Sequence, residues 1–97
     1  MSEAKAQASA KPREFDLIVY GATGFTGGLV AEYLLRKGEL PINRWAIAGR
    51  DKVKLTEVRA RLKEIDPSAG DLSLVTASSG DTQSLEAMCA RTRVVIT

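Results

Sequence analysis

The 97-residue sequence contains no histidine and a single cysteine, Cys89. An internal disulfide is therefore impossible, and the sequence excludes a zinc site of cysteine and histidine ligands and a Ser-His-Asp catalytic triad. We expect no metal site. Cys89 falls beside Leu85 and Met88 on the apolar side of an expected helix, which predicts a buried structural thiol.

Excess charge and long apolar runs are also missing. Fourteen basic and twelve acidic residues give a net charge of +2, which favours neither nucleic acid nor a membrane surface as a partner. No run approaches the roughly 18 apolar residues of a transmembrane helix. With 44% apolar and 27% charged residues, the composition is typical of a globular protein. We expect a cytoplasmic location.

Residues 1–13 lack the apolar segment of a signal peptide and predict a disordered leader. From residue 14 the pattern alternates between strands and helices. Apolar runs predict strands at 15–20, 45–48, 72–77 and 94–96, and helical spacing predicts helices at about 26–37, 52–65 and 82–90. Right-handed crossovers make this a doubly wound α/β fold of the Rossmann type, with a parallel sheet in the order 3-2-1-4. Gly38, Asp51 and Asp81 are the expected helix caps.

A glycine-rich turn, Gly21-Ala22-Thr23-Gly24-Phe25-Thr26-Gly27, joins the first strand to the first helix. Gly21 permits a tight exit from the strand, Gly24 permits close approach of a pyrophosphate through a positive φ, and Gly27 leaves room for the helix against the sheet. The free N–H groups and positive end of the helix would face the phosphates. The spacing is GxxGxxG rather than GxGxxG. A purely structural turn is the alternative, but the flanking strand and helix favour nucleotide binding.

The second strand ends in Ala48-Gly49-Arg50-Asp51. NAD-binding proteins place an acidic residue at this strand end to hold the ribose hydroxyls. Here Arg50 can bind a 2′-phosphate with its planar cation, and Gly49 leaves space for the adenosine ribose, so NADP is favoured over NAD. Asp51 is better placed as a helix cap, and Lys54 adds positive potential. The alternative makes Arg50 a surface residue paired with Asp51 or with a neighbouring helix.

The segments 15–27 and 45–50 resemble the saccharopine dehydrogenase-like oxidoreductases, a group that includes the bacterial trans-acting enoyl reductases. The resemblance extends to Thr97. It implies that residues 14–97 are the N-terminal part of an NAD(P)-binding Rossmann domain, truncated after about four strands. It also implies NADP(H)-dependent hydride transfer to a lipid-like or small-molecule substrate. The sequence departs from the family in lacking a Val-Gly-Pro turn after the fourth strand, and in having Ser78 where an Asp is frequent.

No catalytic acid or base is identified. Tyr33 and Lys37 have the spacing of a Tyr-x-x-x-Lys pair, but they lie on the helix after the glycine turn, where the resemblance gives no catalytic role. We therefore expect the 97 residues alone to have no reductase turnover. The alternatives are a non-catalytic NADP-binding sensor and a non-functional fragment. The predicted cofactor-binding residues are Gly21, Ala22, Thr23, Gly24, Phe25, Thr26, Gly27, Gly49 and Arg50.

Overall fold

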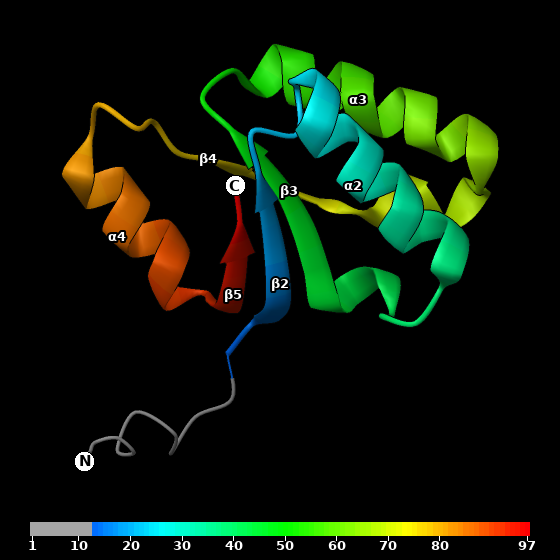
Figure 1. Cartoon of the computed structure of the whole chain (residues 1–97), viewed down its shortest axis with the longest axis horizontal. Coiled ribbons are helices and arrows are strands. Elements are labelled where there is room, and N and C mark those ends of the chain that lie inside the picture. Colours follow the sequence, from blue (N-terminus) through cyan, green and yellow to red (C-terminus); the bar gives the residue numbers. More distant parts are fainter. Residues whose placement is uncertain (1–12) are drawn as a thin grey trace.

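Four parallel strands form the centre of the computed structural model, which describes residues 13–97. The strands are β2 (Phe15–Tyr20), β3 (Trp45–Gly49), β4 (Ser73–Thr76) and β5 (Thr92–Ile96), in the spatial order β4-β3-β2-β5 (Figure 1). All three neighbouring pairs are parallel. This confirms the predicted α/β fold with the strand order 3-2-1-4.

Helices cover both faces of the sheet (Figure 1). Helices α2 (Phe25–Lys37) and α3 (Lys52–Ile65) lie on one face, and α4 (Thr82–Ala90) lies on the other. Two 3-10 turns, η1 (Ile42–Arg44) and η2 (Pro67–Asp71), occupy segments that we predicted as loops. Each crossover returns the chain to the same end of the sheet, so the carboxyl ends of the strands meet at one edge.

The hydrophobic core is divided by the sheet into two clusters, because neighbouring residues of a strand point to opposite faces. Val19 belongs to the cluster under α2 and α3, whereas Ile18 belongs to the cluster under α4, and both are fully buried. Burial of each such side chain contributes about 1.5–3 kcal/mol to folding. The apolar strand β2 is therefore covered on both faces of the sheet.

The three predicted helix caps are confirmed. Gly38 ends α2 in the left-handed conformation, with φ of 67°, and its N–H donates to the carbonyl oxygen of Leu34. The Asp51 carboxylate accepts hydrogen bonds from the first amides of α3, and the Asp81 carboxylate does the same for α4. Asp51 and Asp81 fix where α3 and α4 begin at the carboxyl edge of the sheet, and Gly38 fixes where α2 ends near the opposite edge.

The prediction of a buried Cys89 is wrong, because its side chain is exposed. Helix α4 turns Met88 toward the sheet, with Leu85 on the same side, and the next position lies about 100° further round the helix. Helix α2 likewise buries Ala31 and Leu35. The expected leader over residues 1–13 lies outside the described residues except for Arg13.

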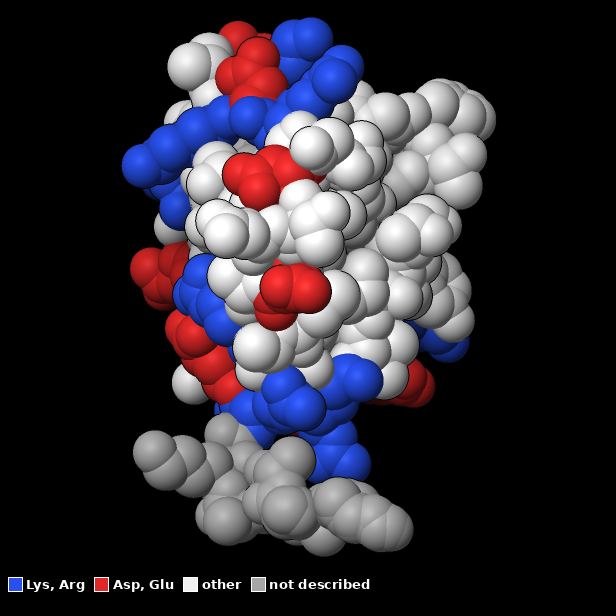
Figure 2. Space-filling view, turned by 90° about the vertical axis from the view of Figure 1, so that its left-hand side faces the viewer, with Lys and Arg blue, Asp and Glu red and all other residues white. Residues whose placement is uncertain are grey.

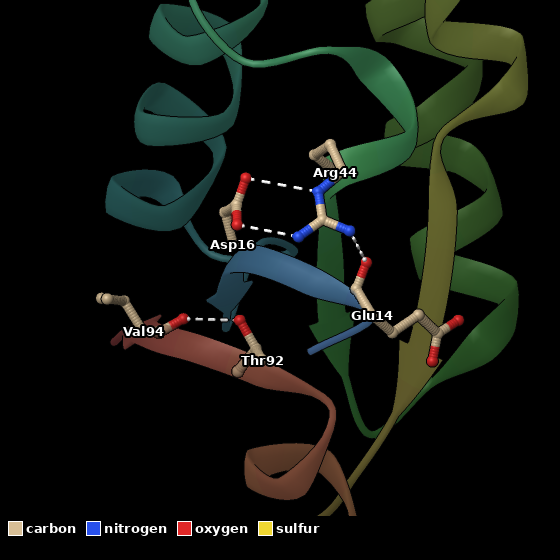
Figure 3. A network of polar contacts seen from close by, with 5 residues as sticks. All are labelled: Glu14, Asp16, Arg44, Thr92 and Val94. Atoms are coloured by element: carbon tan, nitrogen blue, oxygen red, sulfur yellow. Dashed lines mark hydrogen bonds and ion pairs between the residues drawn. The ribbon is translucent and has the colours of Figure 1, made fainter. Parts of the chain in front are cut away.

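Salt bridges connect the start of β2 to neighbouring segments at the end of the sheet where β2 begins; Figure 3 shows the one between Asp16 and Arg44. Asp16 accepts two hydrogen bonds from the Arg44 guanidinium, at 2.9 and 3.3 Å, and a third Arg44 nitrogen donates to the carbonyl oxygen of Glu14 at 2.9 Å. The Glu14 carboxylate accepts two further bonds from Arg91, at 2.8 and 3.0 Å. These contacts tie the start of β2 to η1 and to the residue that precedes β5.

The same contacts lower two carboxyl pKa values. Hydrogen bonds from Arg44 hold the pKa of Asp16 below its ordinary value of 3.8, although partial burial opposes the shift. Hydrogen bonds from Arg91 lower the pKa of Glu14 from its ordinary value of 4.5 in the same way. Both groups are therefore ionised in the folded protein at neutral pH.

Candidate dinucleotide-binding site

The glycine turn is fastened to the end of the neighbouring strand. The carbonyl oxygen of Ala48 accepts hydrogen bonds from the N–H groups of Gly21 and Ala22, at 2.9 and 3.3 Å. One strand further, the N–H of Ala77 donates to the carbonyl oxygen of Gly49 at 2.9 Å. The ends of β2, β3 and β4 thus form a continuous hydrogen-bonded edge, which holds the turn close to the strand end that carries Arg50.

Gly21 and Gly27 have the roles that the sequence predicted for them. Gly21 leaves β2 with φ of 81°, a conformation that L side chains rarely adopt. Gly27 packs directly on this turn, and a Cβ at position 27 would overlap the carbonyl oxygen of Gly21. The turn and the first helical residues can therefore occupy this space only if position 27 has no side chain.

The strain that we predicted at Gly24 is absent. Its φ is −85° and its ψ is 172°, which is extended backbone open to any residue. The prediction failed because the tight part of the turn is at Gly21, whose carbonyl oxygen accepts the Gly24 N–H at 2.9 Å. A Cβ at position 24 would lie 3.4 Å from that same oxygen. Any role of Gly24 in ligand approach thus concerns space and not backbone conformation.

The N-terminus of α2 has no side-chain cap, since Gly24 is its N-cap residue. In the chain between residues 13 and 97, the amides of Phe25, Thr26 and Gly27 donate to no backbone acceptor, and the first helical bond runs from Gly28 to Gly24. The N-cap and the first two helical residues are exposed. Three N–H donors without a backbone acceptor and the positive end of the helix dipole therefore lie beside the turn, an arrangement that suits an anion.

Arg50 follows the last residue of β3 and is exposed. The alternative role, a surface pair with Asp51, is not seen in the described part of the chain, where the Asp51 carboxylate accepts from the amides of Val53 and Lys54 instead. Lys and Arg side chains gather at the upper end of Figure 2, the end at which the strands finish in Figure 1. The Arg50 guanidinium is thus available to a ligand at this edge.

Gly49 is buried between the glycine turn and α3. A Cβ at this position would lie 3.5 Å from Leu55 Cδ2 and 3.8 Å from Thr23 Cγ2, which are ordinary contact distances. The Thr23 side chain therefore lies beside the end of β3. Its predicted role in leaving space for a ribose stays a prediction.

Two grooves begin at Thr23, on the face that carries α2 and α3. One has a volume of about 310 Å³ and the other about 250 Å³. The first is lined by Thr23, Lys54, Glu57, Val58 and Arg61. The second continues from the turn between the two helices, past Phe25, which is 84% exposed. Of the α3 residues that line the first groove, only Lys54 was named from the sequence, and the groove was not predicted, although the spacing 54, 57, 58 and 61 marks one helical face.

The loop after β4 is held by its own hydrogen bonds. The hydroxyl of Tyr20 donates to the carbonyl oxygen of Ala77 at 3.3 Å, across the intervening strand. Ser84 Oγ accepts the N–H of Ser78 at 3.0 Å and donates to the carbonyl oxygen of Asp81 at 2.9 Å. Neither Tyr20 nor Ser84 was among the predicted site residues. Their contacts hold the loop that contains Ser78 at the end of β4.

Within residues 13–97, no three side chains of the metal-binding types come together. No helix in that part of the chain is long and apolar enough to cross a membrane. The features at the carboxyl edge are therefore free backbone amides, an exposed guanidinium and neighbouring lysines. This chemistry can bind and orient an anionic ligand.

The chain is similar to trans-acting enoyl reductases of mycobacteria. It is 45% identical over 89 residues to the proteins of that name from Mycobacterium tuberculosis (strain ATCC 25618 / H37Rv) and from Mycobacterium bovis (strain ATCC BAA-935 / AF2122/97). The identity to the Mycobacterium leprae (strain TN) protein is 44%. In each case the alignment covers 92% of this chain and 20% of the relative.

The chain thus spans about a fifth of the length of the curated relatives that it matches. No protein-family model matches it, and no solved structure matches it either. The aligned length includes the glycine turn and the end of β3, because 89 of the 97 residues are covered. The chain therefore has homologues named trans-acting enoyl reductase over nearly all of its own length.

Proposed function

We propose that this chain binds NADP(H) and serves as the cofactor-binding part of an oxidoreductase related to the saccharopine dehydrogenase-like enzymes. The observation that carries this proposal is the uncapped start of α2, where three amides without a backbone acceptor among residues 13–97 lie beside the Gly21–Gly27 turn. The homology to proteins named enoyl reductase adds the reaction class. We place the protein in the cytoplasm.

In this proposal the residues of the turn have two different roles in binding the pyrophosphate. Gly21 and Gly27 shape the backbone, and the amides of Phe25 and Thr26 donate to the phosphate oxygens. Arg50 binds the adenosine 2′-phosphate with a charge-assisted, bidentate contact. The fit is favourable on the donor side, since within residues 13–97 these amides have no backbone acceptor and the Asp51 carboxylate is occupied in capping α3.

The bound nicotinamide would supply a hydride, and the substrate would be an enoyl group, a carbon–carbon double bond conjugated to a carbonyl, on a lipid-like or small molecule. The residues described above hold the adenosine and phosphate side of the cofactor. We assign no proton donor to this chain, because the residues proposed to bind the cofactor contact only its adenosine and phosphate side.

Titration of the chain with NADPH, followed by the cofactor fluorescence, tests the proposal. We expect saturable binding that NADP⁺ displaces and that weakens with salt, because the phosphate contacts are charged and partly open to solvent. Circular dichroism shows in the same sample that the chain is folded. A folded chain without saturable NADPH binding would disprove the proposed function.

A further inference from the structure

The side chain of Thr23 lies where three elements converge. It belongs to the glycine turn, its Cγ2 is 3.8 Å from the position of a Cβ on Gly49, and it lines the 310 Å³ groove together with Lys54. Gly49 directly precedes Arg50. Thr23 therefore lies both beside the end of β3, which Arg50 follows, and in the groove that Lys54 lines on the first turn of α3.

The charges in this segment are unusual for the start of a helix. The first turn of α3 contains Lys52 and Lys54 and no acidic residue. Cations are disfavoured at a helix N-terminus, where the dipole is positive. The Asp51 carboxylate compensates in part, but it is bound to the amides of Val53 and Lys54. Local conflicts of this kind occur in proteins mainly where a function requires them.

We infer that Lys54 is a second cationic contact of the adenosine 2′-phosphate and so a determinant of the preference for NADP over NAD. The inference rests on the proposed function. A 2′-phosphate is a dianion near neutral pH, and one guanidinium neutralises only part of its charge. Lys54 faces the groove shared with Thr23, whereas Lys52 does not line it. Arg61 lines the groove too, but it is about 10 Å further along the helix axis, beyond Glu57.

The two lysines of the first turn provide a matched pair of variants. Lys54→Gln and Lys52→Gln remove the same charge from the same helical turn, but only the first removes a residue that lines the groove. Binding is measured for NADPH and NADH, and for 2′,5′-ADP and 5′-AMP, which isolate the 2′-phosphate. We expect Lys54→Gln to weaken NADPH and 2′,5′-ADP binding by about threefold to tenfold, and NADH and 5′-AMP binding by less than about twofold. We expect Lys52→Gln to leave the NADPH-to-NADH ratio within about twofold of wild type.

Unfolding midpoints of the ligand-free proteins separate binding from folding. Both substitutions relieve the unfavourable charge at the helix start, so we expect equal midpoints or a slight rise in both. A change of the NADPH-to-NADH ratio in Lys54→Gln alone, at an unfolding midpoint equal to that of Lys52→Gln, supports the inference.

Two results would overturn the proposed role of Lys54, and only the second of them would also disprove the proposed function. If wild type prefers NADPH and both variants keep that preference, Lys54 has no role in specificity while the proposed function stands. If the folded wild-type chain binds none of the four nucleotides, the proposed function fails and the role of Lys54 fails with it.

Discussion

Gly27 lies against the carbonyl group of Gly21, so that a Cβ added at position 27 would fall 2.7 Å from the Gly21 carbonyl carbon and overlap its oxygen. Six residues apart in the sequence, the two glycines bring the start of α2 onto the end of β2. This contact fixes where the free amides of the helix start are held. The shape of the turn thus depends on a position that itself has no ligand-binding group.

Gly27→Ala is expected to destabilise the protein by about 1–3 kcal/mol, because the backbone must move to accommodate the methyl group. Gly28→Ala is the matched control. Its Cβ would lie 3.5 Å from the Ala22 carbonyl oxygen, an ordinary contact, and replacing a helical glycine gains about 0.5–1 kcal/mol. Urea unfolding of both variants measures the difference. Equal stabilities would mean that the close contact of Gly27 is unimportant.

Gly24→Val is expected to abolish NADPH binding while leaving the protein folded. The extended backbone at this position suits a β-branched residue, and the new side chain would occupy the space next to the amides of the helix start. Fluorescence titration and circular dichroism are measured on the same sample. NADPH affinity equal to that of wild type, in a folded variant, would contradict the phosphate-binding role of the turn.

The topology and the helix ends could be predicted because they depend on local, strongly patterned signals. Three strand-and-helix units with right-handed crossovers leave few arrangements of a parallel sheet. Gly38, Asp51 and Asp81 were identifiable as caps from residue type and position alone. The topology also places the candidate site, since dinucleotides are expected to bind where the strand order reverses.

What could not be predicted depends on how the helices are rotated against the sheet. The spacing of apolar residues on α4 did not show that Met88 rather than Cys89 is buried. On α2, Leu29 and Tyr33 were at helical spacing with other apolar residues, yet they are 51% and 60% exposed. The prediction of a positive φ at Gly24 was wrong for a different reason. Of the glycines in the turn only Gly21 has a positive φ, and the residue types alone do not show which glycine adopts it.

The salt bridge of Asp16 with Arg44 is expected to make stability depend on pH. Because the pKa of Asp16 is lower in the folded state than its ordinary value of 3.8, the salt bridge stabilises the protein fully above that value. The stabilisation is lost as the pH falls through the lower, folded-state pKa. Glu14, whose pKa Arg91 lowers from 4.5, acts in the same direction. Stability should therefore decline below about pH 4.

A double-mutant cycle of Asp16→Asn and Arg44→Met isolates the contribution of this pair. We expect a favourable coupling free energy at pH 7 that is much smaller at about pH 2, because the Asp16 carboxylate loses its charge as the pH falls through its lowered pKa. Thermal unfolding at the two pH values provides the measurement. A coupling that is the same at both would show that charge is not what holds β2 to η1.

The preference for NADP depends on Arg50 in this account. Arg50→Ala should weaken NADPH binding by about tenfold to a hundredfold, corresponding to a charge-assisted hydrogen bond worth roughly 1.5–3 kcal/mol, and leave NADH binding nearly unchanged. Arg50→Lys should restore only part of the loss, since a point charge cannot form the bidentate contact. Higher salt should reduce the preference in wild type.

The most direct test of the central claim is the ratio of the NADH and NADPH dissociation constants, measured in wild type and in Arg50→Ala under identical salt. The account predicts a ratio well above one in wild type that falls about tenfold or more in the variant. A surface role for Arg50 predicts that both constants change equally or not at all. A ratio that Arg50→Ala leaves unchanged would contradict the assignment of NADP as the cofactor.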